Sequence, residues 1–155
     1  MIRRPPLHVT VPTNRAYRSE RNWGKPAPMD GLNEIIDQNR TNRYHAADVE
    51  RDNIQWVARF VRMAMQKAHY PPMTKHDRQR CMVYVCVVEP HDQRDVANVY
   101  GGVLKYALDA LTHRNKHGTG CIWDDNTRWM PKLVPSIRID PANVGLEITI
   151  VPLED

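Results

Sequence analysis

Two adjacent acids lie among tryptophans in the stretch CIWDDNTRW, residues 121–129. Asp124 and Asp125 have apolar surface on both sides, which is typical of a half-buried site and less common for solvated surface acids. A third acid, Asp95, lies in QRDVANV just ahead of a helix-like run. Mg²⁺ takes oxygen ligands, and one or two carboxylates suffice when water and phosphate complete its shell. These acids therefore predict a divalent-metal site, provided that the fold brings their segments together.

Apolar periodicity predicts the elements that would position these acids. Strands are expected at residues 7–11, 81–88, 129–139 and 146–151, and helices at residues 46–69 and 96–112. The order β-α-β-α-β-β predicts one α/β (α+β) domain, with helices packed on a mixed sheet. The 81–88 run is continuously apolar, as in a central strand. The last two strands are joined by a short turn, so we expect them to pair with each other in antiparallel fashion.

The predicted order places the acids near strand ends. Asp95 follows the 81–88 strand as the N-cap of the second helix, and the 124–125 pair precedes the next strand. If that strand neighbours 81–88, we expect all three acids at one rim of the sheet, where α/β folds bind ligands. Adjacent acids on extended backbone face opposite ways, so Asp124 and Asp125 serve one site only where a turn bends the chain. The alternative is that these acids are helix caps and solvated loop ends.

The totals exclude a membrane-spanning protein and favour a soluble domain. The 155 residues are 41% hydrophobic and 26% charged, and no apolar run approaches the length of a membrane span. We find no signal peptide, and the three cysteines indicate reduced thiols in a cytoplasmic setting. The net charge of +4 falls within residues 1–43, where eight Lys and Arg face four acids. This predicts either an arm that contacts a polyanion or a flexible arm that is merely solvated. Tyr17 and Trp23 in this arm would stack on unpaired bases, or else would pack against the protein or have no contact role.

The second predicted helix contains the glycine pair Gly101 and Gly102. Glycine inside a helix costs about 1 kcal/mol relative to alanine, so the pair calls for a packing or binding reason. It predicts the close approach of another backbone or of a phosphate, or else tight packing of the helix on a strand.

Four motifs occur in a defined order along the chain. They are GLNEII with RTNRY at 31–36 and 40–44, RDVAN at 94–98, KYALDAL at 105–111, and a glycine-containing loop followed by DD at 118–125. In this order they resemble the RusA-like crossover-junction endodeoxyribonucleases of bacteria and their phages, especially the phage-type members. The family pattern is R-D-x-D-N, then K-x-x-x-D-A-L, then the glycine loop and two acids. The resemblance covers about residues 31–151, so we interpret 1–30 as a basic strand-and-loop extension and 31–155 as the RusA-like part of one domain.

The resemblance implies a homodimeric, Mg²⁺-dependent nuclease, with Mn²⁺ as a substitute, that hydrolyses four-way junctions or related branched DNA without any membrane association. A bacterial or phage-encoded cytoplasmic protein is expected. By position, Asp95, Asp124 and Asp125 would be catalytic and bind the metal, and Lys105 would be the basic catalytic residue. The alternative for Lys105 is an exposed i,i+4 ion pair with Asp109. The residues implied to contact DNA are Asn33, Arg40, Arg43, Asn98, Arg114 and Lys116, although Asn98 would orient either its loop or a phosphate.

One position departs from the family pattern. The second acid of R-D-x-D-N is Ala97 in this chain, and alanine cannot bind a metal. Three accounts follow: the site works with fewer protein ligands and more water, another acid such as Asp92 or Asp124 moves in, or the protein binds DNA without cutting it. The sequence thus supports two hypotheses, a junction-cleaving nuclease and a catalytically weakened or silent dimer that binds branched DNA.

Overall fold

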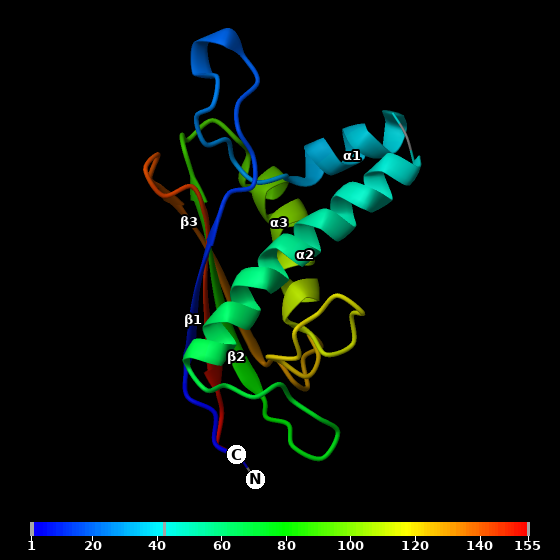
Figure 1. Ribbon diagram of the computed structural model, residues 1–155, viewed down its shortest axis with the longest axis vertical. Coiled ribbons are helices and arrows are strands. Elements are labelled where there is room, and N and C mark those ends of the chain that lie inside the picture. The colour runs from blue at the N-terminus through cyan, green and yellow to red at the C-terminus, as the bar shows by residue number, and fades with distance from the viewer. Residues whose placement is uncertain (1, 42, 155) are drawn as a thin grey trace.

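In the computed structural model, which describes residues 2–41 and 43–154 and no side chains of 38–46, three helices pack on one four-stranded sheet (Figure 1). The elements are β1 (Leu7–Pro12), a 3₁₀ turn η1 (Glu20–Asn22), α1 (Leu32–Thr41), α2 (Arg43–Lys67), β2 (Cys81–Glu89), α3 (Val96–Leu111), β3 (Lys132–Ile139) and β4 (Gly145–Pro152). The predicted single-domain fold is confirmed, with α1 as an added helix ahead of α2. None of the helices in the described part carries an apolar stretch long enough to cross a bilayer.

The strands lie in the order β1-β4-β2-β3. β2 runs parallel to β3 and antiparallel to β4, and β4 is also antiparallel to β1. The last two strands run in opposite directions, as predicted, but they do not pair with each other, because β2 lies between them. Their connecting turn passes over the end of β2, where the Asp140 amide donates to the Glu89 carbonyl at 2.9 Å. The strongly apolar β2 thereby gains a partner on each side, as its composition requires.

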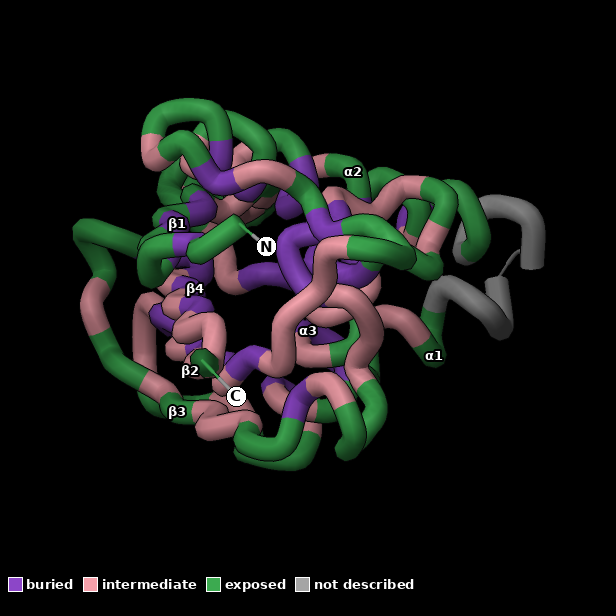
Figure 2. The backbone as a smooth tube through the Cα atoms, turned by 90° about the horizontal axis from the view of Figure 1, so that it is seen from below, coloured by how far each residue is buried: buried purple, intermediate pink, exposed green. Residues whose placement is uncertain are grey.

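Only one face of the sheet is fully covered. Along β2, Val83 and Val85 are buried and point toward the helices, whereas Tyr84 and Cys86 alternate with them and are half-buried. β1 and β4 alternate in the same way, so the core lies between the sheet and the helices α2 and α3 (Figure 2). This one-sided burial follows from the period of two along each strand.

The segment between β1 and α1, residues 13–31, folds back on itself at the upper end of the sheet in Figure 1. Arg15 pairs with the buried Asp30 at its base, and the Tyr17 hydroxyl lies 2.9 Å from Nε2 of His91. Tyr17 therefore packs against the protein, while Trp23 at the tip is 75% exposed. The strand that precedes this arm, β1, pairs with β4 and belongs to the main sheet.

The glycine pair lies where α3 meets the start of α1. A Cβ atom added to Gly102 would lie 2.4 Å from the carbonyl carbon of Gly31, whereas one on Gly101 would meet the Leu32 side chain at 3.0 Å. The predicted close approach of another backbone is confirmed at Gly102. The absence of a side chain there lets α1 begin directly against α3.

Candidate functional site

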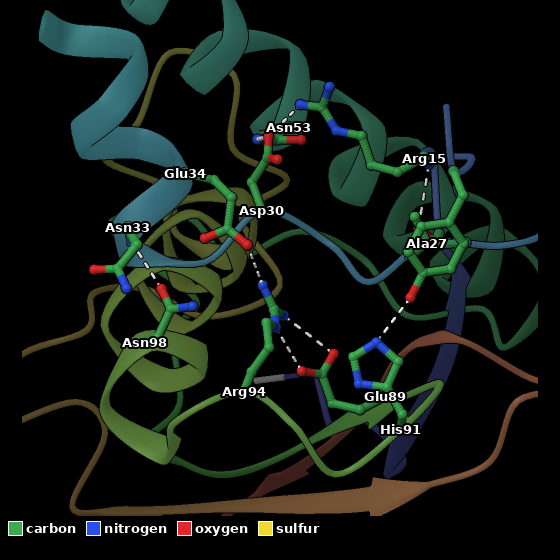
Figure 3. Close-up of polar contacts among 12 residues, drawn as sticks. Arg15, Ala27, Asp30, Asn33, Glu34, Asn53, Glu89, His91, Arg94 and Asn98 are labelled. Carbon is green, nitrogen blue, oxygen red and sulfur yellow. Dashed lines mark hydrogen bonds and ion pairs between the residues drawn. The ribbon is translucent and has the colours of Figure 1, made fainter. Parts of the chain in front are cut away.

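The N-terminal end of α3 carries the RDVAN motif, and its arginine is enclosed by carboxylates. Arg94 donates to both Glu89 oxygens, at 2.7 Å and 3.1 Å, and to Oε1 of Glu34 at 2.7 Å (Figure 3). The Glu89 side chain is only 3% exposed and that of Arg94 11%. Burial opposes the charged guanidinium and would lower the pKa of Arg94, but the hydrogen bonds and negative charges of Glu89 and Glu34 together outweigh it and raise that pKa. This arginine thus joins the end of β2 to α1.

The two predicted DNA-contacting asparagines meet each other at this end. The Asn33 backbone amide donates to Oδ1 of Asn98 at 2.7 Å (Figure 3). This bond satisfies one of the amides that the first turn of α1 leaves without an intrahelical partner. Asn98 therefore orients the loop that begins α1, which is one of its two expected roles, and DNA contact by either asparagine stays a prediction.

Asp95 occupies the N-cap position of α3, as predicted from its place before the helical run. Its backbone carbonyl accepts from the Val99 amide at 3.1 Å, but its side chain makes no capping hydrogen bond. The carboxylate is exposed and has no hydrogen bond or ion pair within the described part of the chain. Ala97 lies exposed in the first turn of the same helix.

Asp124 and Asp125 lie beyond the C-terminal end of α3, in the loop that leads to β3. The Asp125 amide donates to Oδ1 of Asp124 at 2.8 Å, which marks a bend between the two residues. Arg114 Nη2 lies 3.7 Å from Oδ1 of Asp124 and 3.6 Å from Oδ1 of Asp125. The bend that the sequence requires for a shared role of these two acids is therefore present, and both carboxylates approach the same cation.

Like charges gather around this acidic pair. Burial raises the pKa of Asp125, and the hydrogen bond and negative charge of Asp124 raise it further. Burial also raises the pKa of Asp109 on α3; the charge of Lys105 opposes this rise, and the negative charges of Asp125 and Glu50 add to it. Lys105 forms its ion pair with Glu50 of α2, at 3.6 Å, in place of the i,i+4 pair with Asp109. Its side chain is 71% exposed, so this pair contributes little to stability.

The predicted convergence of Asp95 with Asp124 and Asp125 is wrong within one copy of the chain. β3 runs parallel to β2, and the Cys81 amide donates to the Trp129 carbonyl, so the two strands start side by side. Asp95 follows the end of β2, whereas the acidic pair precedes the start of β3. The 16 residues of α3, roughly 24 Å of helix, separate the two segments (Figure 1).

The side chains that the resemblance implies as ligands consequently do not fit one Mg²⁺ centre in a single chain. Among residues 2–41 and 43–154, apart from the side chains of 38–46, no group of three or more His, Cys, Asp or Glu is placed to hold a metal ion. If β3 ran antiparallel to β2, its start would lie beside the end of β2 and the acids would be close together. Because the two strands are parallel, the acids lie at opposite ends of the strand pair.

The remaining predicted DNA contacts differ in their surroundings. Arg114 is engaged with the acidic pair, as described above. Lys116 is exposed and lies at a shallow pocket of about 300 Å³ that Asp48 and Glu50 also line. The predicted contacts at Arg40 and Arg43 fall outside the residues whose side chains are described.

The sequence analysis missed a basic cleft at the end of the sheet where β2 and β3 begin. The cleft measures about 460 Å³, and the charged and aromatic side chains that line it are Arg3, Arg78, Arg80, Arg128, Trp129 and Glu154. These residues come from four segments that lie far apart in the sequence, so no short charged stretch predicts the cleft. The available signal was the pattern of arginines beside tryptophan in NTRW and of RQR just before β2.

The chain matches no protein-family model, and neither curated proteins nor solved structures gave a match. The resemblance to the RusA-like nucleases therefore rests on the ordered motifs alone.

Proposed function

We propose that this protein binds branched DNA, above all four-way junctions, and that a single copy does not form the metal centre needed to cut it. The observation that carries the second half of this proposal is the separation of Asp95 from Asp124 and Asp125 by the length of α3. DNA binding is supported by the ordered motifs, by the net charge of +4, and by the arginine-lined cleft.

The motif residues at the N-terminal end of α3 have a role that needs no metal. Arg94 and Asn98 fasten α1 to α3 through Glu34 and Asn33. With Ala97 in the place of the second acid, the RDVAN motif retains one acid, Asp95, whose carboxylate is exposed. The motif can therefore stabilise the fold of a DNA-binding protein even though it lacks the second acid of a metal site.

A second candidate is cleavage of DNA by a site shared between two copies. Two observations favour it: the Asp95 carboxylate has no partner in the described residues, and Asp124 and Asp125 both approach one cation at the other end of α3. In a two-fold dimer with antiparallel α3 helices, the N-terminal end of one helix meets the C-terminal end of the other. A complete set of acids then comes from both copies.

The two candidates are separated by one experiment on the full chain. Purified protein is incubated with a synthetic four-way junction and with a linear duplex of the same arms, in Mg²⁺, in Mn²⁺ and in chelator. Non-cutting binding predicts a retarded junction complex that weakens steeply with salt, unchanged by chelator and without nicked product. Equal affinity for the linear duplex would contradict selectivity for branched DNA, and no retardation of either DNA would overturn the proposed function.

If nicked product appears, mixing two variants shows whether the acids of one active site come from one copy of the chain or from two. Asp95→Asn and Asp125→Asn homodimers should each be inactive. When the two variants are mixed and exchange subunits, a shared site predicts recovery of part of the activity, because one of the two sites in each heterodimer then holds both acids. Sites formed within one copy predict no recovery, since every site would carry one substitution.

A further inference from the structure

Aromatic rings and guanidinium groups form a continuous stack beside the basic cleft. His113 stacks on Trp123 with 4.2 Å between ring centroids. The Arg78 guanidinium carbon lies 5.0 Å from the centroid of Trp123 and 4.5 Å from that of Trp129. Arg128 lies 5.4 Å from the Trp129 centroid. We name these five residues the cation–aromatic stack; they come from the loop before β2 and from the loop between α3 and β3.

The two guanidinium groups of the stack have no hydrogen-bonding partner among the residues that the structure describes. Arg78 and Arg128 form no side-chain hydrogen bond or ion pair within the described residues. Each guanidinium carries five N–H donors in a planar fork, and its attraction to an indole face does not use those donors. The rings therefore hold the guanidinium planes in place, and the donor edges stay available.

Four other arginines of this protein are matched with buried or neighbouring carboxylates. Their pairs are Arg4 with Asp77, Arg15 with Asp30, Arg94 with Glu89 and Arg138 with Glu147. The stack differs in that aromatic rings, which carry no net charge, take the place of the acids. The charges of Arg78 and Arg128 consequently face no paired acid within the described part of the chain. Among the described residues, Glu154 is the one acid that lines the cleft, and it already pairs with Arg3 at 3.6 Å.

We infer that the cation–aromatic stack binds the phosphodiester backbone of nucleic acid through the donor edges of Arg78 and Arg128. Guanidinium forks match the geometry of phosphate oxygens, and a preordered fork loses less side-chain entropy on binding than a free one. The cleft beside the stack adds Arg3 and Arg80 to the same positive surface. This inference rests on the proposed DNA binding and assigns the surface that performs it.

The test compares charge-matched double variants for binding to a labelled four-way junction. Arg78→Gln with Arg128→Gln should weaken binding by about tenfold or more, and should lower the slope of log affinity against log salt by about two, one for each lost phosphate contact. The matched control is Arg59→Gln with Lys67→Gln, which removes two exposed cations of α2 and should change neither quantity by much. Thermal unfolding of each variant checks that the fold is kept.

Two further variants test whether the planar guanidinium fork is needed and whether the N-terminal arm is the DNA-binding surface instead. Arg78→Lys keeps the charge, so the salt slope should stay while affinity falls, because lysine lacks the bidentate fork. Arg18→Gln with Arg21→Gln removes charge from the N-terminal arm. If the arm variant loses binding while the Arg78 and Arg128 variant keeps it, DNA binding stands and the stack is not its surface.

A measurement on the unaltered protein completes the test. Arginine-specific modification followed by mass spectrometry should show Arg78 and Arg128 protected when the junction is bound, with Arg59 as the unprotected reference. Wild-type binding without this protection would overturn the inference alone. Failure of the wild-type protein to bind any DNA would overturn both the inference and the proposed function.

Discussion

The two ends of α3 use similar charges in opposite ways. At the N-terminal end, Arg94 is buried with Glu89 and also bonded to Glu34, so that charge serves to join elements. At the C-terminal end, Arg114 is 74% exposed and approaches two acids at 3.6–3.7 Å. The difference shows that burial, more than residue type, decides whether a charge in this protein holds the fold together or stays available to a ligand.

The largest effect is expected from breaking the buried network. Arg94→Met should lower the free energy of unfolding by about 3–5 kcal/mol, because it leaves Glu89 as an uncompensated buried charge. Arg114→Met at the other end should cost less than about 1 kcal/mol, since its ion pairs are exposed. Urea unfolding of both variants measures the contrast, and equal losses would contradict it.

A double variant sharpens the same comparison. Arg94→Met with Glu89→Leu removes both partners of the most buried pair, and should recover much of the stability lost in Arg94→Met alone. Recovery identifies the stranded Glu89 charge as the cause of the loss. If the double variant is less stable than the single one, the packing of the side chains outweighs the charge.

The next effect concerns how closely α1 approaches α3 at the N-terminal end. Gly102→Ala should cost about 1–3 kcal/mol, because its Cβ would collide with the Gly31 backbone at 2.4 Å, which cannot rotate away. Gly101→Ala meets the movable Leu32 side chain, and the better helix propensity of alanine offsets that contact. Thermal unfolding should separate the two variants, and identical shifts would count against the close approach.

A smaller, pH-dependent effect is expected at the C-terminal end. The folded state raises the pKa of Asp125, so it binds this proton more tightly than the unfolded state does. Stability contributed by this group is therefore lost as pH rises from about 4, the ordinary carboxyl range, through the raised pKa. Asp125→Asn should be more stable than wild type at pH 7, and the difference should vanish at lower pH, where Asp125 is protonated in both states.

Asp140 supplies the control of opposite sign. Its hydrogen bond with Asn143 holds the pKa of Asp140 below the ordinary range, so the folded state favours the charged form. Asp140→Asn should therefore be less stable than wild type at pH 7, with the difference shrinking as pH falls through the lowered pKa. Denaturant melts across pH measure both variants, and shifts of the same sign would contradict the assigned environments.

The smallest effect is expected where the family pattern is interrupted. Ala97→Asp places an acid in the exposed first turn of α3, and the helix dipole should raise stability by about 0.3–1 kcal/mol at low salt. It also places a second carboxylate near Asp95. A rise in melting temperature with added Mg²⁺, present in this variant and absent in Ala97→Asn, would show that the position lies within reach of a metal. An equal response of both variants would show that it does not.

Local features of this fold were readable from the sequence. The spacing of apolar residues predicts the helix over 96–112, and a continuous apolar run predicts the central strand over 81–88; the structure places them at Val96–Leu111 and Cys81–Glu89. Each pattern depends on neighbours two to four residues apart, which the chain order fixes. A bend between Asp124 and Asp125 was only a condition for a shared role of the two acids, and the structure shows that it is present.

Only the tertiary structure decided which functional groups meet. The parallel pairing of β2 with β3 sent Asp95 and Asp125 to opposite ends of α3, although the sequence places both next to predicted strand ends. The same pairing brought Arg78 against Trp123 and Trp129, which lie far along the chain. Strand order and direction depend on contacts between distant segments, and a periodicity of two or 3.6 residues carries no information about them.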